Sequence, residues 1–202
     1  MAYCTDFIGH VEVRPGLNEA ELDYLIKFTG SRRWRRPDGP YAVPTEDCEE
    51  EPVASRAWHL PAEGQPTLWC DWTPCWDGCC LTWEGEERFA GVGTWLCYLV
   101  EHFLRPGARA STSADPRFRR FSFDHVLDGM VVGCRRDNKQ LFAVTVHQNR
   151  VREEILRRGD RRLRRLPPLP YEELVDAGRG DGGVSRPGRT AQVLPFTGAA
   201  GR

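Results

Sequence analysis

The sequence predicts an α+β fold: an antiparallel sheet, made of a β-hairpin and a three-stranded meander, with a buried central helix and an N-terminal helix. Apolar and polar residues alternate on both sides of an apolar helical segment at 92–104. Turn dipeptides at 128–129 and 137–138 join the later alternating stretches as antiparallel neighbours. With 202 residues, 40 % of them hydrophobic, the chain is long enough for one core and short for two.

The first helix is predicted at 17–29. Asn18 is a favourable N-cap residue, and Glu21 stands at the reciprocal position of a capping box. Apolar residues then recur at helical spacing and form one stripe, namely Leu22, Leu25 and Ile26. The prolines and glycine of 37–40 end the helical pattern.

A long irregular loop is predicted at 36–66, which is rich in proline and acidic residues and has no sustained period. The hairpin follows it. Residues 68–72 and 81–85 each alternate between apolar and polar side chains, and Trp76-Asp77-Gly78 lies between them as the turn.

The central helix at 92–104 is apolar on most of its sides, so it is expected to be the buried centre of the domain. The meander after it is predicted from three alternating stretches at 121–127, 130–136 and 141–147. Together with the N-terminal helix, these elements form a single predicted domain at 1–150.

The C-terminal part is predicted to lie outside that domain. The arginine-rich segment 151–166 reads as a short helix interrupted at Gly159, and a proline-rich linker continues to 175. Residues 176–202 are rich in glycine, arginine and proline and poor in apolar residues, so a disordered tail is expected there.

Composition narrows the class of protein. No run of about 18 apolar residues is present, so no membrane partner is expected. The first residues lack the basic and apolar regions of a signal peptide, which favours a cytoplasmic location with reduced cysteines. The net charge of −1 argues against a dedicated nucleic-acid protein, which is usually clearly basic.

The order of features in the middle of the chain resembles that of a group of small bacterial and phage hypothetical proteins with no assigned activity. The resemblance extends over roughly 17–147 and is most specific around 68–106. It implies a natural bacterial domain and implies no function, cofactor or catalytic residue. The residues that carry it are Leu68-Trp69-Cys70 with Trp72, Asp77-Gly78, Leu81, Trp83-Glu84-Gly85, Glu87, Phe89, Trp95-Leu96, Tyr98-Leu99, His102-Phe103-Leu104 and Pro106.

Four cysteines crowd the predicted hairpin with the spacing C-x4-C-x3-C-C, which differs from the C-x2-C of most structural zinc sites. Across a three-residue turn, Cys75 and Cys79 would face one another, and Cys80 would point to the opposite face. Cys70 would lie on the order of 16 Å along the strand from Cys75. Inert thiols are favoured and no cofactor is expected. The alternatives are a redox-responsive Cys75–Cys79 pair and a zinc ion completed by His59 or Cys48.

Aromatic residues provide the binding hypotheses. Trp69, Trp72, Trp76 and Trp83 crowd the hairpin, and alternation places aromatic rings on both of its faces. One set is expected in the core and the other on an exposed surface that binds a protein. A second hypothesis is nucleic-acid binding, by Trp34 with Arg33 and Arg35 and by the arginine-rich segment 150–165.

Recognised catalytic motifs are absent from the sequence. A Cys/His enzyme would need Cys97, His102 and His125 to converge in one cleft, with Asp124 beside them. We therefore expect a non-enzymatic cytoplasmic binding domain that contacts another protein through the tryptophan-rich hairpin. A nucleic-acid-binding protein and a Cys/His enzyme are the alternatives.

Overall fold

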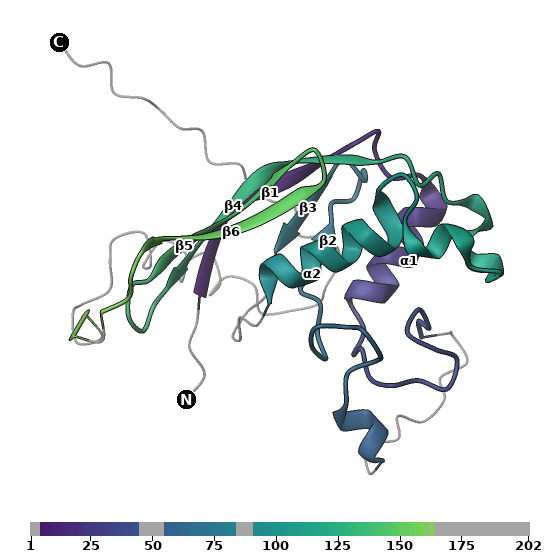
Figure 1. The fold of residues 1–202 in the computed structure, drawn as a ribbon, viewed down its shortest axis with the longest axis horizontal. Coiled ribbons are helices and arrows are strands. Elements are labelled where there is room, and N and C mark those ends of the chain that lie inside the picture. Colours follow the sequence, from purple (N-terminus) through teal and green to yellow (C-terminus); the bar gives the residue numbers. More distant parts are fainter. Residues whose placement is uncertain (1–4, 45–54, 84–90, 161, 164–202) are drawn as a thin grey trace. The chain divides into compact units, whose positions relative to one another are not determined.

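The computed structural model of this protein describes residues 5–44, 55–83, 91–160 and 162–163 (Figure 1). The chain divides into Met1–Leu166 and Pro167–Arg202, and all described residues belong to the first unit. The predicted proline-rich linker and the predicted disordered tail lie outside the described residues, as does the acidic part of the predicted loop at 45–54.

A six-stranded antiparallel sheet is the framework of the first unit, and its strand order is β2-β3-β1-β4-β5-β6 (Figure 1). The predicted α+β class is thereby confirmed. The strands are β1 (Thr5–Arg14), β2 (Trp72–Pro74), β3 (Cys80–Trp83), β4 (Val126–Arg135), β5 (Leu141–His147) and β6 (Arg150–Arg157).

Strand β1 is absent from the prediction, although it occupies a central position. It pairs with β3 on one side and with β4 on the other, where the ladder runs from Thr5↔Arg135 to Arg14↔Val126. Val11 and Val13 are buried while Glu12 between them is not, so this end of the strand does alternate. Because β1 lies between the hairpin and the meander, it makes one sheet out of the two.

The predicted meander is shifted by one strand, and this corrects two expectations. Residues 150–157 form β6 and not part of a helix, so the sheet continues past the predicted domain boundary at 150. Gln148 and Asn149 both have positive φ, at 48° and 65°, which suits a tight two-residue hairpin turn. That turn returns the chain along β5, whose edge hydrogen bonds outweigh the helical preference of the arginine-rich segment.

The predicted strand at 121–127 contributes only its end to the sheet. β4 begins at Val126, and the residues before it have no strand pairing. Phe123 has a φ of 51°, and the His125 backbone N–H donates to the Leu104 carbonyl oxygen at 3.0 Å. This backbone group therefore satisfies its hydrogen bond at the end of the central helix and not in a ladder.

Helix α1 (Glu19–Thr29) begins as predicted. The Asn18 side chain accepts from the N–H groups of Ala20 and Glu21, and the Glu21 carboxylate accepts from the Asn18 N–H at 2.8 Å, which completes the capping box. The buried face of the helix differs from the predicted stripe, because Ile26 is 47 % exposed. The buried side chains are Glu21, Tyr24, Leu25, Phe28 and Thr29.

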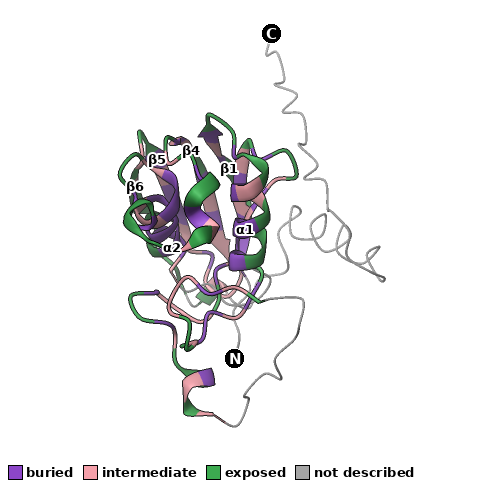
Figure 2. Ribbon diagram, turned by 90° about the vertical axis from the view of Figure 1, so that its right-hand side faces the viewer, coloured by how far each residue is buried: buried purple, intermediate pink, exposed green. Residues whose placement is uncertain are grey.

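Helix α2 (Val92–Leu99) continues into a π-helical turn, η2 (Val100–Leu104). Both α1 and α2 lie on the same face of the sheet (Figure 2). The predicted central helix is confirmed as the buried centre, since α2 contacts both edge strands, β2 and β6. The most deeply buried side chains of α2 and η2 are Val92, Trp95, Leu96 and Phe103.

Candidate functional site

The four hairpin tryptophans divide into two core residues and two accessible ones. Trp72 is 0 % exposed, and its indole N–H donates to the Val92 carbonyl oxygen at 2.9 Å. Trp83 packs edge-on against it, with the ring centroids 5.7 Å apart. Trp69 is 48 % exposed and Trp76 is 81 % exposed. A hairpin binding surface is therefore limited to Trp69 and Trp76.

Arg33 was predicted to contact a ligand, but it is a structural residue that is 0 % exposed. Its guanidinium lies 3.8 Å from the Phe28 ring centroid, and burial lowers its pKa to about 10. Because an unpaired buried cation is costly, each of the three guanidinium nitrogens donates to at least one acceptor. The acceptors are the Ser31 hydroxyl, the carbonyl oxygens of Pro40 and Ala42, and the Gln65 side-chain oxygen.

Trp34 is likewise buried, so its ring is not available to stack on a base as predicted. It forms a β-bridge with Pro61, and its ring centroid lies 5.8 Å from that of Trp58. Arg35 is exposed, and its backbone N–H donates to the Leu60 carbonyl oxygen at 3.0 Å. Of these three residues, only Arg35 offers an accessible side chain. The other predicted contact was the segment 150–165, and its arginines on β6, namely Arg150, Arg152 and Arg157, are exposed.

A pocket of about 310 Å³ opens beside these residues. Three separate segments build it: the end of α1 with the extended stretch that follows, the 3₁₀ turn η1 (Arg56–His59), and the stretch before β2. The residues that line it are Gly30, Ser31, Arg32, Arg36, Pro44, Trp58 and Trp69. We call it the arginine–tryptophan pocket.

Arg32 is one of the two cations that line this pocket. Its guanidinium carbon lies 4.9 Å from the Trp58 ring centroid and 5.7 Å from that of Trp69, within the range of cation–π attraction. Its Nε donates to the Trp58 carbonyl oxygen at 3.2 Å, which fixes the plane of the guanidinium. Arg36 is stacked similarly, 5.0 Å from the ring centroid of Trp34. The pocket thus offers two oriented cations and two indole walls.

Sequence reasoning did not single out three of these residues as site residues: Arg32 and Arg36, which belong to the basic stretch around Trp34, and Trp58. The first two carried a readable signal, because in an extended stretch residues 32, 34 and 36 share one face and Arg33 takes the other. Trp58 carried none. It reaches the pocket from a distant part of the predicted loop, through backbone pairing around Pro61.

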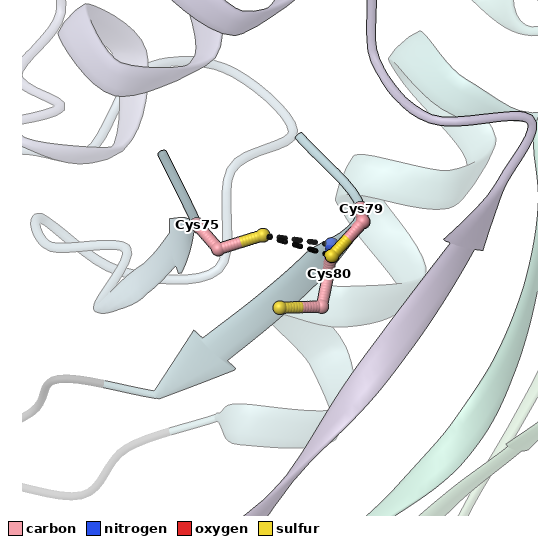
Figure 3. Close-up of side chains that lie close together, drawn as sticks. All are labelled: Cys75, Cys79 and Cys80. Carbon is pink, nitrogen blue, oxygen red and sulfur yellow. Dashed lines mark hydrogen bonds between the residues drawn. The ribbon is translucent and has the colours of Figure 1, made fainter. Parts of the chain in front are cut away.

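Three of the hairpin cysteines, and not only the pair Cys75 and Cys79, have their sulfurs close together. The sulfurs of Cys75 and Cys79 are 3.6 Å apart, and Figure 3 shows them turned toward one another beside Cys80. The Cys80 sulfur lies within 4.8 Å of both, so the expectation that it faces away is wrong. The reason is the register: the Cys75 N–H donates to the Cys80 carbonyl oxygen at 2.9 Å, so these two residues are the opposing pair.

Cys70 and the two residues predicted to complete a zinc site, His59 and Cys48, are not in this group of sulfurs. Cys70 is 1 % exposed, and burial raises its pKa. His59 belongs to η1 and is not part of the cluster, and Cys48 lies outside the described residues. Within the cluster, the Asp77 carboxylate raises the pKa of Cys79 to about 11, and burial raises that of Cys80.

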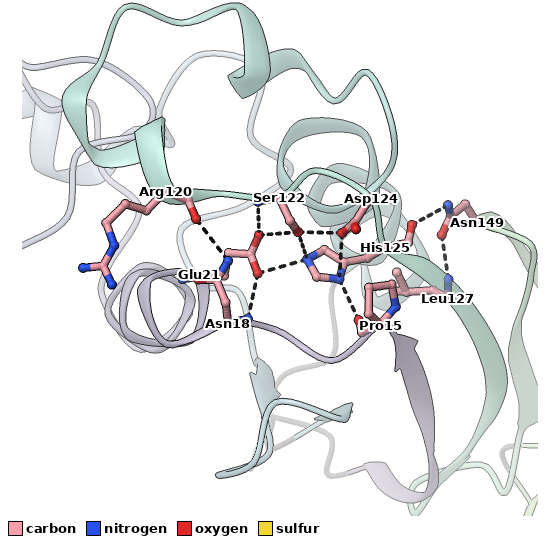
Figure 4. A network of polar contacts seen from close by, with 9 residues as sticks. All are labelled: Pro15, Asn18, Glu21, Arg120, Ser122, Asp124, His125, Leu127 and Asn149. Atoms are coloured by element: carbon pink, nitrogen blue, oxygen red, sulfur yellow. Dashed lines mark hydrogen bonds and ion pairs between the residues drawn. The ribbon is translucent and has the colours of Figure 1, made fainter.

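A buried polar network joins α1 to the segment before β4 (Figure 4). Glu21 and His125 are each 1 % exposed, and their Oε2 and Nε2 atoms are 3.1 Å apart. His125 Nδ1 lies 2.7 Å from the Pro15 carbonyl oxygen, and Ser122 Oγ lies 3.2 Å from Nε2. A catalytic triad has its carboxylate and hydroxyl on opposite ring nitrogens, whereas here the Glu21 carboxylate and the Ser122 hydroxyl both approach Nε2, and the Asp124 carboxylate lies 3.9 Å from Nδ1, beyond hydrogen-bond distance. The arrangement is that of a buried imidazolium–carboxylate pair.

His102 lies in different surroundings. Its ring stacks on that of Tyr98 at 3.8 Å between centroids, and its Nδ1 is 2.8 Å from the Tyr41 hydroxyl. Burial, with Arg109 nearby, lowers the pKa of His102 to about 4. Cys97 is exposed. In the described part of the chain, no hydrogen bond or ion pair joins any two of Cys97, His102 and His125, so the predicted Cys/His cleft is not assembled there.

Comparisons with protein-family models, with curated proteins and with solved structures found no match for this chain. Within the described residues, no helix has the length and apolar character needed to cross a membrane. Among the arrangements above, the arginine–tryptophan pocket is the one that combines accessible charge with accessible aromatic surface.

Proposed function

We propose that this chain is a non-enzymatic cytoplasmic binding domain that docks a protein partner in the arginine–tryptophan pocket. The observation that carries the proposal is the position of Arg32, held against Trp58 beside half-exposed Trp69. Of the tryptophans expected to form a contact surface at the hairpin, this proposal keeps Trp69. It adds the arginines of the stretch after α1. The group that enters the pocket is an acidic side chain or a chain-terminal carboxylate.

The charge of the pocket supports an anionic group. Its lining contains Arg32 and Arg36, and none of the described residues that line it is acidic. A guanidinium presents its donors in a planar fork that matches a carboxylate in two parallel hydrogen bonds. Among the described residues, Arg32 donates a hydrogen bond through Nε alone, which leaves the outer edge of its guanidinium to such a ligand.

The rigidity of the pocket supports tight rather than transient contact. Tryptophan and arginine are the residue types that most often dominate binding energy at protein interfaces. Arg32 is already stacked and hydrogen-bonded, so less side-chain freedom is lost when a partner binds. The backbone nearby is also fixed in place, because the buried Arg33 donates hydrogen bonds to the carbonyl oxygens of Pro40 and Ala42.

The side chains that line this pocket are suited to binding rather than to catalysis. Proton transfer in enzymes depends on groups such as histidine, carboxylates, lysine or cysteine. None of these types is among the described residues that line the pocket. Arginine and tryptophan orient and attract a ligand without exchanging protons with it at neutral pH.

Single-stranded nucleic acid is the second candidate, and Trp69 is the observation that favours it. A half-exposed indole next to a guanidinium can stack a base while the cation contacts phosphate. Trp34, the ring expected in that role, is buried, so Trp69 would replace it. Such binding would weaken steeply as salt is raised.

The test is selection of displayed peptides against the full chain, followed by affinity measurements with pocket and control variants. We expect the selected peptides to be enriched in aspartate, glutamate or a free C-terminus. They should bind Arg32→Gln and Trp69→Ala roughly tenfold more weakly, which corresponds to about 1.4 kcal/mol. Arg35→Gln and Trp76→Ala alter exposed residues outside the pocket, so they should bind as the parent does.

Peptides without an acidic preference, or equal losses in pocket and control variants, would overturn the proposal. A labelled oligothymidylate distinguishes the second candidate. A salt-sensitive gel shift that Trp69→Ala abolishes, together with failed peptide selection, would favour nucleic acid.

A further inference from the structure

The hairpin tip gathers three thiols at the spacing of metal ligands. The sulfurs of Cys75, Cys79 and Cys80 all lie within 4.8 Å of one another, and the closest pair is 3.6 Å apart. Zinc–sulfur bonds of about 2.3 Å in tetrahedral geometry place ligand sulfurs roughly 3.8 Å apart. Each sulfur is therefore within about 1 Å of a ligand position, which rotation about a side-chain bond can cover.

The backbone holds the three thiols in this arrangement. Gly78 has a φ of 71°, and a side chain there would meet the Leu17 carbonyl oxygen at 2.9 Å. The turn is fastened to the end of β1 and the residues after it through Gly78 and Cys79. The Leu17 N–H donates to the Gly78 carbonyl oxygen at 3.0 Å, and the Val13 N–H donates to that of Cys79 at 2.8 Å. Ligands fixed in this way lose little freedom when an ion binds.

The surroundings of the sulfurs suit a bound cation. The Cys80 backbone N–H points at the Cys75 sulfur from 2.9 Å, and hydrogen bonds of this kind orient metal ligands and tune their charge. Cys79 is exposed while Cys75 and Cys80 are partly buried, so an ion can enter from solvent. The Asp77 carboxylate, 3.0 Å from the Cys75 sulfur, adds negative charge beside the site.

We propose that Cys75, Cys79 and Cys80 together bind one thiophilic metal ion, with Zn²⁺ as the ion to test. Thiolate sulfur is the ligand type that selects zinc and copper(I) over calcium or magnesium. Three protein ligands leave the fourth tetrahedral position open, as in zinc sites that exchange their fourth ligand. On binding, three sulfur–metal bonds replace three S–H bonds, and the three protons pass to water or buffer. No electron is transferred.

A disulfide between Cys75 and Cys79 is the competing use of the same atoms. It would consume two thiols, require an external oxidant, and leave the third sulfur without a role. The two hypotheses differ in the role of Cys80, which is a ligand of the metal site and takes no part in the disulfide. The metal site is also independent of the proposed function, because Arg32 and Trp69 are not among its ligands.

The first experiment titrates Zn²⁺ into the reduced full chain in competition with a chromophoric chelator. We expect one ion per chain, and at least tenfold weaker binding for each of C75S, C79S and C80S. Cys97→Ser removes an exposed thiol outside the cluster and should bind zinc as the parent does. The pocket variants R32Q and W69A should also retain zinc binding, whether or not they still bind the protein partner.

The absence of saturable one-to-one binding would overturn the proposal, and so would undiminished binding by C80S. The second experiment uses no variant, so it holds even if a serine substitution unfolds the chain. Cysteine alkylation of the parent protein is mapped by mass spectrometry with and without Zn²⁺. Joint protection of Cys75, Cys79 and Cys80, with Cys97 still reactive, is the expected result. Protection of Cys75 and Cys79 alone would contradict a three-thiol site.

Discussion

The buried pair of Glu21 and His125 makes a quantitative prediction about stability. Glu21→Gln removes the negative charge but keeps the size of the side chain and an oxygen that can accept from the Asn18 N–H. The His125 imidazolium would then stay buried with only the more distant Asp124 carboxylate, 3.9 Å from its Nδ1, as a counter-ion. Breaking a buried ion pair from one side is strongly destabilising, because the remaining charge is left uncompensated.

The magnitude follows from the pKa of Glu21. Burial alone would raise this pKa, but hydrogen bonds from His125 and from the N–H groups of Asn18 and Ser122 outweigh it and lower the value from 4.5 to about 2. At 1.36 kcal/mol per pKa unit, this difference corresponds to about 3 kcal/mol of the free energy of unfolding. We expect Glu21→Gln to lose about that much at pH 5 to 6.

The loss should depend on pH in a defined way. Because the folded-state pKa of Glu21 is lowered, its contribution is complete above 4.5 and disappears as the pH falls toward 2. Burial lowers the pKa of His125, but the hydrogen bonds and charge of its partners raise it overall above 6.5. Its contribution is therefore complete below 6.5 and declines as the pH rises through the folded-state pKa. The free energies of unfolding of the parent and the variant should therefore differ most between pH 4.5 and pH 6.5.

The assay is urea unfolding followed by tryptophan fluorescence, at about pH 3, 5.5 and 8.5. Asp23→Asn is the matched control, since Asp23 lies on the same helix in an exposed pair with Lys27 at 2.9 Å. Exposed pairs of this spacing contribute about 0.3–0.5 kcal/mol. A loss in Glu21→Gln that is the same at all three pH values, or that Asp23→Asn reproduces, would refute the reasoning.

Three further predictions concern the hairpin and the stretch after α1. Arg33→Lys should lower the free energy of unfolding by about 2 kcal/mol or more, because one ammonium cannot serve four acceptors, while Arg35→Lys should change it little; thermal unfolding of both variants checks this. Trp72→Ala should cost about 3–5 kcal/mol in denaturant unfolding and Trp76→Ala almost nothing, and similar losses would contradict their assigned burial. Gly78→Ala should cost roughly 1–3 kcal/mol, owing to its positive φ and the 2.9 Å contact, and a neutral result would show that the turn can relax.

Several elements could be predicted from sequence because their causes are local. The start of α1 depends on Asn18 and Glu21, which satisfy backbone N–H groups within one turn of the chain. The burial of α2 depends on apolar residues around most of its circumference, which leaves no polar face for solvent. Such features are complete within about ten residues, so the order of residue types is enough to specify them.

The remaining features depended on partners far away in the chain. Segment 151–157 has helix-forming residues, yet the free edge of β5 offers a hydrogen-bond partner for its backbone, and this decides for β6. Cys80 joins the other two thiols because the backbone pairs Cys75 with Cys80.

The contrast is sharpest in the arginine–tryptophan pocket. From sequence alone, Arg32 and Arg33 are equivalent neighbours in one basic stretch. In the fold, Arg33 is buried because four acceptors converge on it, and Arg32 lies in a pocket because Trp58 and Trp69 flank its guanidinium. The sequence by itself thus determined which segments become helices and turns where the signals are local. The tertiary structure decided which side chains are buried and which meet, because burial and contact depend on segments that only folding brings together.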